Sequence, residues 1–80
     1  MTKNEFFLVI AEALGVEPSS VTIATSQSDL EEWDSLGHLA ILQALDNKTG
    51  GQLDAVKGVG SITTVGSLWE AMHQAGLVQE

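Results

Sequence analysis

The sequence predicts an all-α protein: a small four-helix bundle with three longer helices, a short third helix, and a long loop between helices 1 and 2. Apolar residues recur at helical spacing in three segments of the chain. Residues that commonly cap helices precede these segments, and glycines follow them. The 80 residues contain no repeat, low-complexity segment or linker, so we expect a single domain over residues 1–80.

The first helix is expected to begin near Lys3. Thr2 and Glu5 have the spacing of a capping box, in which each residue satisfies a backbone amide of the other. Gly15 fits the end of this helix, because glycine readily adopts the left-handed conformation that stops one. The apolar positions between these two signals are Phe6, Phe7, Ile10, Ala13 and Leu14.

Residues 16–33 are expected to form a long connection, opened by a turn at Pro18. Val21 and Ile23 alternate with threonine and resemble a strand, but no second strand is available to pair with them. We therefore expect these two side chains to hold the loop against a helical core. Loops of this length usually have a function or contain short structure of their own.

The second helix is expected over residues 35–48, with Asp34 as its cap and Gly50 after its end. Its apolar residues cover most of its circumference, and a small bundle cannot easily bury all of them. Either the long loop covers the remainder or a partner or ligand does, and we favour the partner or ligand. The residues in question are Leu36, Leu39, Ala40, Ile41, Leu42, Ala44 and Leu45.

A short helical turn is expected over residues 53–57, before Gly58 and Gly60 loosen the backbone. Thr64 is suited to cap the last helix, and Gly76 to end it. An apolar stripe at helical spacing lies between them and should face the core: Val65, Leu68, Trp69 and Met72.

The charge is strongly negative. Eleven acidic residues against three lysines and no arginine give a net charge of −8. This argues against nucleic acid as a partner, because phosphates would be repelled, and favours partners with basic surfaces. No cysteine is present, no signal peptide is evident, and the apolar run at residues 6–11 is too short to span a membrane. We expect a monomeric, cytoplasmic protein that does not bind membranes.

Ser35 is the candidate functional residue. It stands at the first position of the predicted second helix, directly after Asp34, and a run of acidic residues lies just upstream (Asp29, Glu31 and Glu32). The first turn of a helix can project from the fold, so another enzyme could reach the hydroxyl. Since no residue in the sequence obviously activates it, we expect a serine that is modified rather than one that attacks.

Two other kinds of chemistry receive little support. His38 lies three residues after Ser35, but no nucleophile-elbow pattern surrounds the serine and the chain is short for a sheltered site, so we expect no enzyme activity. His38 and His73 are far apart in sequence. Residues 29–34 lack the glycine that a calcium loop needs at its sixth position, where Asp34 stands. We expect no metal site.

Two motifs together resemble the acyl carrier protein family, which includes peptidyl carriers. Asp34-Ser35-Leu36 opens the central helix, and Ile62-Thr63-Thr64-Val65 opens the last one. The order of helices and loops is also similar, so the resemblance covers essentially the whole chain. The three-residue motif is weak alone. Its placement in a small acidic helical chain, with the second motif at suitable spacing, makes the combination specific.

The resemblance implies that Ser35 receives a covalent 4′-phosphopantetheine from coenzyme A. A separate phosphopantetheinyl transferase would attach it with magnesium, which Asp34 would help to place besides capping the helix. The thiol of the arm would then carry an acyl or aminoacyl group as a thioester. Further partners would be an acyl- or aminoacyl-activating ligase, an acyltransferase or a synthase.

The residues after the serine depart from the pattern of fatty acid carriers, which have several acids there. This helix contains only Asp46 as an acid, so we expect a specialised biosynthetic pathway. Gly37 would either admit a partner closely or simply be tolerated. The expected partner-binding residues are Trp33, Leu36, Gly37, Leu39, Ala40 and Asp46. Candidates to line an acyl pocket, unless they are plain core, are Leu42, Leu45, Ile62 and Leu68.

The alternative is an unmodified acidic helical module that binds a protein. Ser35 would then only start a helix, and Trp33 would be an interface anchor. In a carrier, Trp33 would instead brace the loop or flank the arm.

Overall fold

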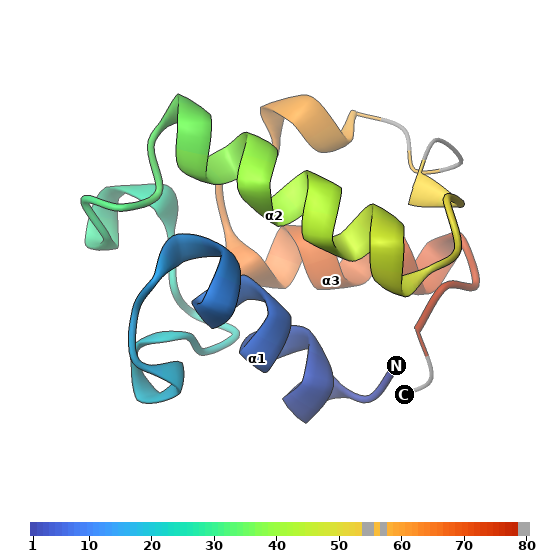
Figure 1. The fold of residues 1–80 in the computed structure, drawn as a ribbon. Coiled ribbons are helices and arrows are strands. Elements are labelled where there is room, and N and C mark those ends of the chain that lie inside the picture. Colours follow the sequence, from blue (N-terminus) through green and yellow to red (C-terminus); the bar gives the residue numbers. More distant parts are fainter. Residues whose placement is uncertain (54–55, 57, 79–80) are drawn as a thin grey trace.

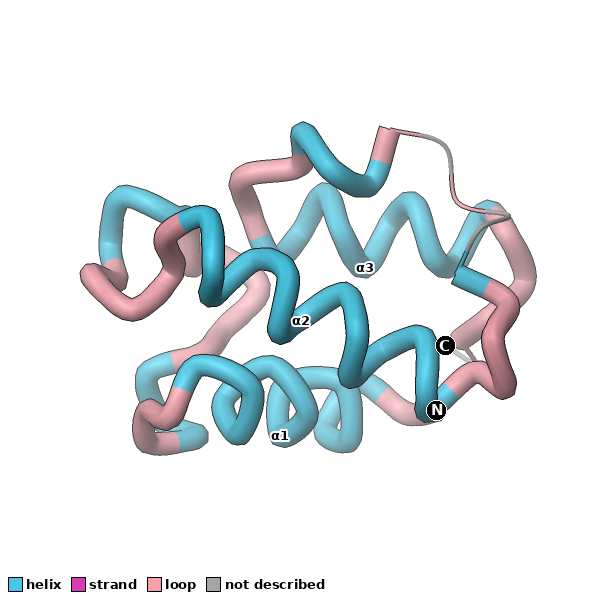
Figure 2. Tube along the Cα trace, turned by 45° about the horizontal axis from the view of Figure 1, so that its top comes forward, coloured by secondary structure: helices cyan, strands magenta, loops and turns pink. Residues whose placement is uncertain are grey.

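Three α-helices pack together in the computed structural model (Figures 1 and 2). They are α1 (Lys3–Leu14), α2 (Ser35–Lys48) and α3 (Val65–Gln74). The structure describes residues 1–53, 56 and 58–78. Short 3₁₀ turns lie in the connections: η1 (Pro18–Ser20), η2 (Gln27–Asp29) and η4 (Val59–Ser61).

The ends of α1 follow the predicted signals. The Thr2 hydroxyl accepts a hydrogen bond from the Glu5 amide at 3.3 Å, and the Glu5 carboxylate accepts one from the Thr2 amide at 3.1 Å. This is a complete capping box. At the other end, Gly15 has φ of 71°, a left-handed conformation that suits glycine. The predicted boundaries of the first helix are confirmed.

The other two helices are also capped by the predicted residues. The Asp34 carboxylate accepts a hydrogen bond from the Gly37 amide at 2.8 Å, and the Thr64 hydroxyl accepts one from the Ser67 amide at 3.1 Å. Each bond satisfies an amide that has no partner within its own helix. The predicted limits of α2 are confirmed, and Gly76 follows the end of α3 with φ of 75°.

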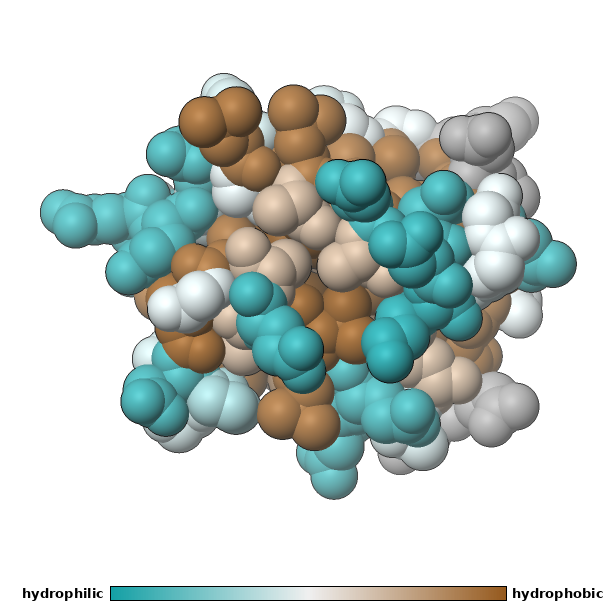
Figure 3. All heavy atoms as spheres, in the orientation of Figure 1, coloured by the Kyte–Doolittle hydropathy of each residue, from teal (hydrophilic) through white to brown (hydrophobic). Residues whose placement is uncertain are grey.

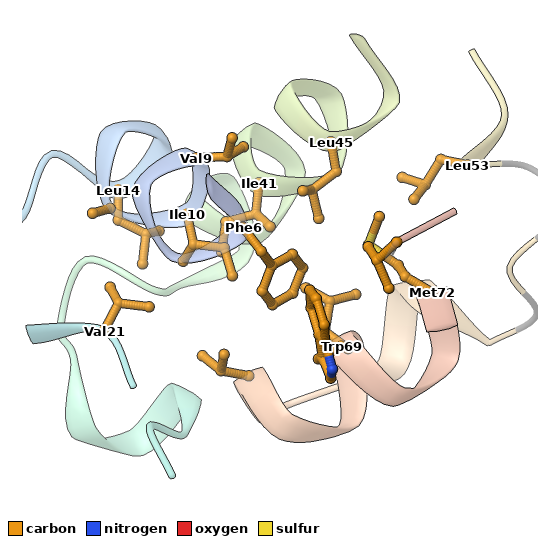
Figure 4. Close-up of a cluster of buried hydrophobic side chains, with 14 of the residues drawn as sticks. Phe6, Val9, Ile10, Leu14, Val21, Ile41, Leu45, Leu53, Trp69 and Met72 are labelled. Atoms are coloured by element: carbon orange, nitrogen blue, oxygen red, sulfur yellow. The ribbon is translucent and has the colours of Figure 1, made fainter. Parts of the chain in front are cut away.

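The core lies where the three helices meet (Figure 4). Phe6 of α1 packs against Trp69 of α3, with ring centroids 5.0 Å apart in an edge-to-face arrangement that suits aromatic pairs. Met72 and Leu45 are also buried. The predicted apolar stripe of the last helix therefore faces the core, and α2 supplies buried side chains to the same cluster.

The long connection is held partly as predicted. Val21 is buried, but Ile23 is 44% exposed, so only one of the two expected side chains holds the loop to the core. Backbone hydrogen bonds also hold the loop. The Gln27 amide donates to the Thr63 carbonyl at 2.7 Å, and the Val65 amide donates to the carbonyl of Thr25 at 2.9 Å. These bonds join the loop to the start of α3.

The predicted four-helix bundle is wrong, because the described residues contain three α-helices. The expected short helix at 53–57 includes residues 54, 55 and 57, which lie outside the described residues. Just after it, the chain forms η4, a single 3₁₀ turn in which the Ile62 amide donates to the Val59 carbonyl at 3.4 Å. Gly58 has φ of 72° there and Gly60 follows, and glycine disfavours continued helix.

No helix in the described part of the chain has the length and apolar character needed to cross a membrane. The longest, α2, has 14 residues, whereas a membrane-spanning helix needs about twenty.

Candidate functional site

Ser35 is the first residue of α2, and its side chain lies in an exposed stretch of the chain. Asp34 before it and Leu36 after it are also exposed. The backbone amides of a first helical turn lack intrahelical partners and mark the positive end of the helix dipole. The Asp34 carboxylate takes up one of these amides, that of Gly37. The structure thus presents a solvent-accessible hydroxyl at a helix start.

His38 does not act on this hydroxyl. Its ring is buried, with 9% of the residue exposed. The indole Nε1 of Trp33 donates a hydrogen bond to His38 Nδ1 at 3.0 Å. His38 Nε2 lies 3.0 Å from the Val59 carbonyl oxygen. An indole N–H can only donate, so Nδ1 accepts and Nε2 carries the proton that it donates to Val59. With both nitrogens engaged, the ring has no acceptor left for a proton from Ser35.

Trp33 is buried inside the loop that precedes α2, with only 1% of the residue exposed. Its indole ring lies 6.1 Å from the His38 ring, at 17° between planes. The expected contact of Trp33 with a partner is therefore not available in this structure. Trp33 instead braces the loop against the bundle, and the interface anchor expected of an interaction module is buried.

Gly37 is required by the loop. A Cβ atom at this position would collide with the Glu32 carbonyl oxygen and lie 2.9 Å from Leu14 Cδ2. Backbone atoms cannot move aside as a flexible side chain can. Glycine is thus needed at position 37 because of contacts within the chain, which the sequence did not reveal. The space next to Gly37 is already occupied by Glu32 and Leu14.

The exposed apolar surface lies beside Ser35. Leu36 is 76% exposed and Leu39 is 62% exposed. Figure 3 shows hydrophobic atoms projecting at the edge of the molecule above the first turns of α2. Ala40 is half-buried. Asp46 is half-buried as well, and its carboxylate accepts a hydrogen bond from the Leu53 amide at 3.2 Å. The exposed candidates for partner contact are therefore the two leucines.

An apolar groove of about 560 Å³ runs along the same side of α2. Of the predicted acyl-pocket candidates, Leu42 lines this groove, Leu45 and Leu68 lie fully buried in the core, and Ile62 is half-buried outside its lining. The opposite wall was not among the predicted site residues, because residues 53–57 were expected to form only a short helical turn and residues 58–60 only a loop. The groove is lined by Leu39, Leu42, Gln43, Asp46, Leu53, Val56 and Val59.

Within the described residues, no three His, Cys, Asp or Glu side chains are grouped so as to hold a metal ion. The Asp29 carboxylate accepts hydrogen bonds from the amide and hydroxyl of Ser26, at 2.9 and 3.1 Å, and so caps η2. His73 is exposed in the last turn of α3.

Comparison of the chain with family models, curated proteins and solved structures gives no match.

Proposed function

We propose that this chain is a carrier protein of the acyl carrier type, with Ser35 as the attachment point of a 4′-phosphopantetheine arm. The observation that carries the proposal is the exposed serine that opens α2, with exposed Leu36 and Leu39 beside it. The arm supplies a thiol that holds an acyl or aminoacyl group as a thioester.

The attachment needs little from this chain beyond an accessible hydroxyl. Ser35 Oγ would attack the phosphorus of coenzyme A that bears pantetheine, and the bond to the second phosphate would break. Adenosine 3′,5′-bisphosphate leaves, and the serine is left as a phosphodiester. The serine proton must pass to a base on the separate transferase, because both nitrogens of His38 are engaged.

The residues present fit a phosphodiester at this position. The first turn of α2 offers backbone amides and the positive end of the helix dipole, which favour an anion. Asp34 is exposed next to the serine, so its carboxylate can help to place the magnesium ion of the transferase while it caps the helix. Ser35 is itself exposed, which supports access of the transferase to its hydroxyl.

The surroundings of Ser35 support a specialised carrier. Leu36 and Leu39 form an apolar surface on α2, where the only acid is Asp46. The groove beside Leu39 and Leu42 gives an apolar cargo a place to withdraw from water. Partners would be the transferase and an acyl- or aminoacyl-activating ligase, acyltransferase or synthase. We propose that the protein works as a cytoplasmic monomer.

Intact mass tests the proposal directly. The protein is incubated with coenzyme A, magnesium and a broad-specificity phosphopantetheinyl transferase. We expect the addition of one phosphopantetheine to the native chain and none to Ser35→Ala. Ser67→Ala is the matched control, because Ser67 is an exposed serine in the first turn of α3, and this variant should be modified normally. Failure of several such transferases would contradict the proposal.

The second candidate is an unmodified acidic interaction module, which the exposed Leu36 and Leu39 also favour. It predicts no mass change with any transferase. It also predicts that Ser35→Ala leaves partner binding intact while Leu36→Ala weakens it. A carrier predicts that Ser35→Ala abolishes the loading of cargo.

A further inference from the structure

The two walls of the groove along α2 are joined by a polar contact near each end. Close to Ser35, His38 Nε2 lies 3.0 Å from the carbonyl oxygen of Val59. At the other end, Asp46 Oδ1 lies 3.2 Å from the amide nitrogen of Leu53. Val59, Leu53 and Asp46 also line the groove. The groove is therefore held at both ends by side chains of α2 that bind backbone atoms of the opposite wall.

Ser35 lies on the side of α2 that faces this groove. Leu39, Leu42 and Asp46 follow it at spacings of four, three and four residues, which keep side chains on one face of a helix. The helix rises about 1.5 Å per residue, so His38 and Asp46 are separated by about 12 Å along it. A group attached to Ser35 would thus meet the groove at its His38 end.

The His38 contact determines where Val59 lies. Val59 lines the groove, and its carbonyl is held by the buried imidazole. Gly58, with φ of 72°, and Gly60 flank it, so the backbone on either side offers little stiffness of its own. Trp33 fixes the imidazole from the other side by occupying Nδ1. A substitution at His38 should therefore displace Val59 more than it displaces the helices.

We propose that His38 is a positioning residue that holds Val59 against α2 and sets the opening of the groove beside Ser35. The opening in turn limits the size of the apolar cargo that can withdraw into the groove. The cargo part of this inference rests on the proposed carrier function. The positioning part concerns only residues of the chain and can be tested on the unmodified protein.

Two substitutions separate the contacts of His38. In His38→Asn, the side-chain oxygen takes the place of Nδ1 and can still accept from Trp33, but the side chain is too short to reach Val59. In His38→Gln, the amide nitrogen takes the place of Nε2 and can still donate to Val59. The two variants are thus matched controls for each other.

Hydrogen exchange of the Ile62 amide, which bonds to the Val59 carbonyl, measures the position of that segment. Loss of one buried hydrogen bond should speed this exchange about three- to tenfold in His38→Asn. The rate in His38→Gln should stay near that of the native chain. The indole N–H resonance of Trp33, assigned in a Trp69→Phe background, should change in His38→Gln and persist in His38→Asn. General destabilisation cannot produce this crossed pattern.

Cargo provides the second test. The modified protein is loaded with an acetyl or an octanoyl group, and cleavage of each thioester by hydroxylamine is followed. We expect His38→Asn to change the octanoyl-to-acetyl rate ratio by about threefold or more, since one hydrogen bond sets the opening. His38→Gln should keep the native ratio.

The outcomes are distinct. Unchanged Ile62 exchange in His38→Asn would overturn the positioning role. Faster exchange with an unchanged octanoyl-to-acetyl ratio would overturn the role in cargo size. If Ser35 accepts no phosphopantetheine in the native chain, the proposed function fails and the cargo part fails with it. The exchange experiment still decides the positioning role in that case.

Discussion

The two sides of α2 use the same kind of residue in opposite ways. Ile41 and Leu45 are completely buried against the other helices, whereas Leu36 and Leu39 are mostly exposed. Successive residues turn about 100° around a helix, which places these pairs on opposite faces. The apolar character of a residue therefore does not say whether it builds the core, because the positions of α1 and α3 decide which face is covered.

Leaving the two leucines exposed reduces the stability of the isolated protein. Full burial of a leucine side chain contributes about 1.5–3 kcal/mol relative to exposure, and the exposed pair forgoes most of this. A domain of this size has a stability reserve of only about 0.05–0.15 kcal/mol per residue. Leu36 directly follows Ser35, and Leu39 lines the groove. Their position supports the proposal that another molecule covers this face during function.

The largest expected effect is on the buried face. Leu45→Ala should lower the free energy of unfolding by about 2–5 kcal/mol, because it removes a completely buried side chain of α2 and leaves a cavity in the core. Leu36→Ala is the control and should stay within about 0.5 kcal/mol of the native value. Urea unfolding followed by circular dichroism measures both. An equal loss of unfolding free energy in the two variants would contradict the distinction between the buried and exposed faces of α2.

A second substitution tests the contact between the loop and the first turn of α2. Gly37→Ala should destabilise the protein by about 1–3 kcal/mol, because the new Cβ meets the Glu32 carbonyl. In an open helix the same change would stabilise by up to about 1 kcal/mol. Gly60→Ala is the matched control, since nothing lies within 4 Å of a Cβ there. A higher urea midpoint in Gly37→Ala than in the native chain would contradict this prediction and show that the loop at Glu32 can move away at little energetic cost.

Asp34 should have two separable roles. Asp34→Ala should cost about 1 kcal/mol of stability through loss of the helix cap. Asp34→Asn keeps a capping oxygen for the Gly37 amide, so its unfolding midpoint should stay close to that of the native chain. If the carboxylate also helps to place magnesium, Asp34→Asn should still slow phosphopantetheine transfer. If phosphopantetheine transfer to Asp34→Asn is as fast as to the native chain, Asp34 has only the capping role.

The smallest expected effect concerns pH and lies far from Ser35. Hydrogen bonds from the Thr2 backbone amide and hydroxyl lower the pKa of the Glu5 carboxyl. A lowered pKa in the folded state stabilises the protein above the unfolded pKa, and this stabilisation is lost as the pH falls through the folded value. Glu5→Gln keeps a capping side chain that does not titrate.

Urea midpoints of the native chain and of Glu5→Gln, compared between neutral and acidic pH, should therefore converge as the pH falls. Because Glu5 is exposed at the surface, the difference should be small and should shrink further in salt. A difference that stays constant with pH would contradict the role of the Glu5 charge.

The helices were predictable because their signals are local. The caps at Thr2, Asp34 and Thr64 each act over three residues, and glycines follow the helix ends. The prediction failed between α2 and α3. The structure describes three α-helices rather than the expected four helices. The short helix expected over 53–57 includes three residues outside the described part of the chain, and the turn that follows, η4, contains Gly60 and comes directly after Gly58, which favour a single turn over continued helix.

The candidate site was predictable only in part. Ser35 and its cap could be identified because they are neighbours in sequence. The burial of Trp33 and the engagement of His38 could not, since both depend on the path of the loop and on Val59, 21 residues beyond the histidine. The far wall of the groove was missed for the same reason.

The sequence by itself determined where the three helices begin and end, the acidic charge, and the serine that opens α2, because these depend on residues within one or two turns. Only the tertiary structure decided which leucines are exposed, why residue 37 must be glycine, and that His38 joins the loop before α2 to the segment before α3. Each of these depends on close contact between parts of the chain that the local sequence does not place together, and such contacts form only when the interior is packed.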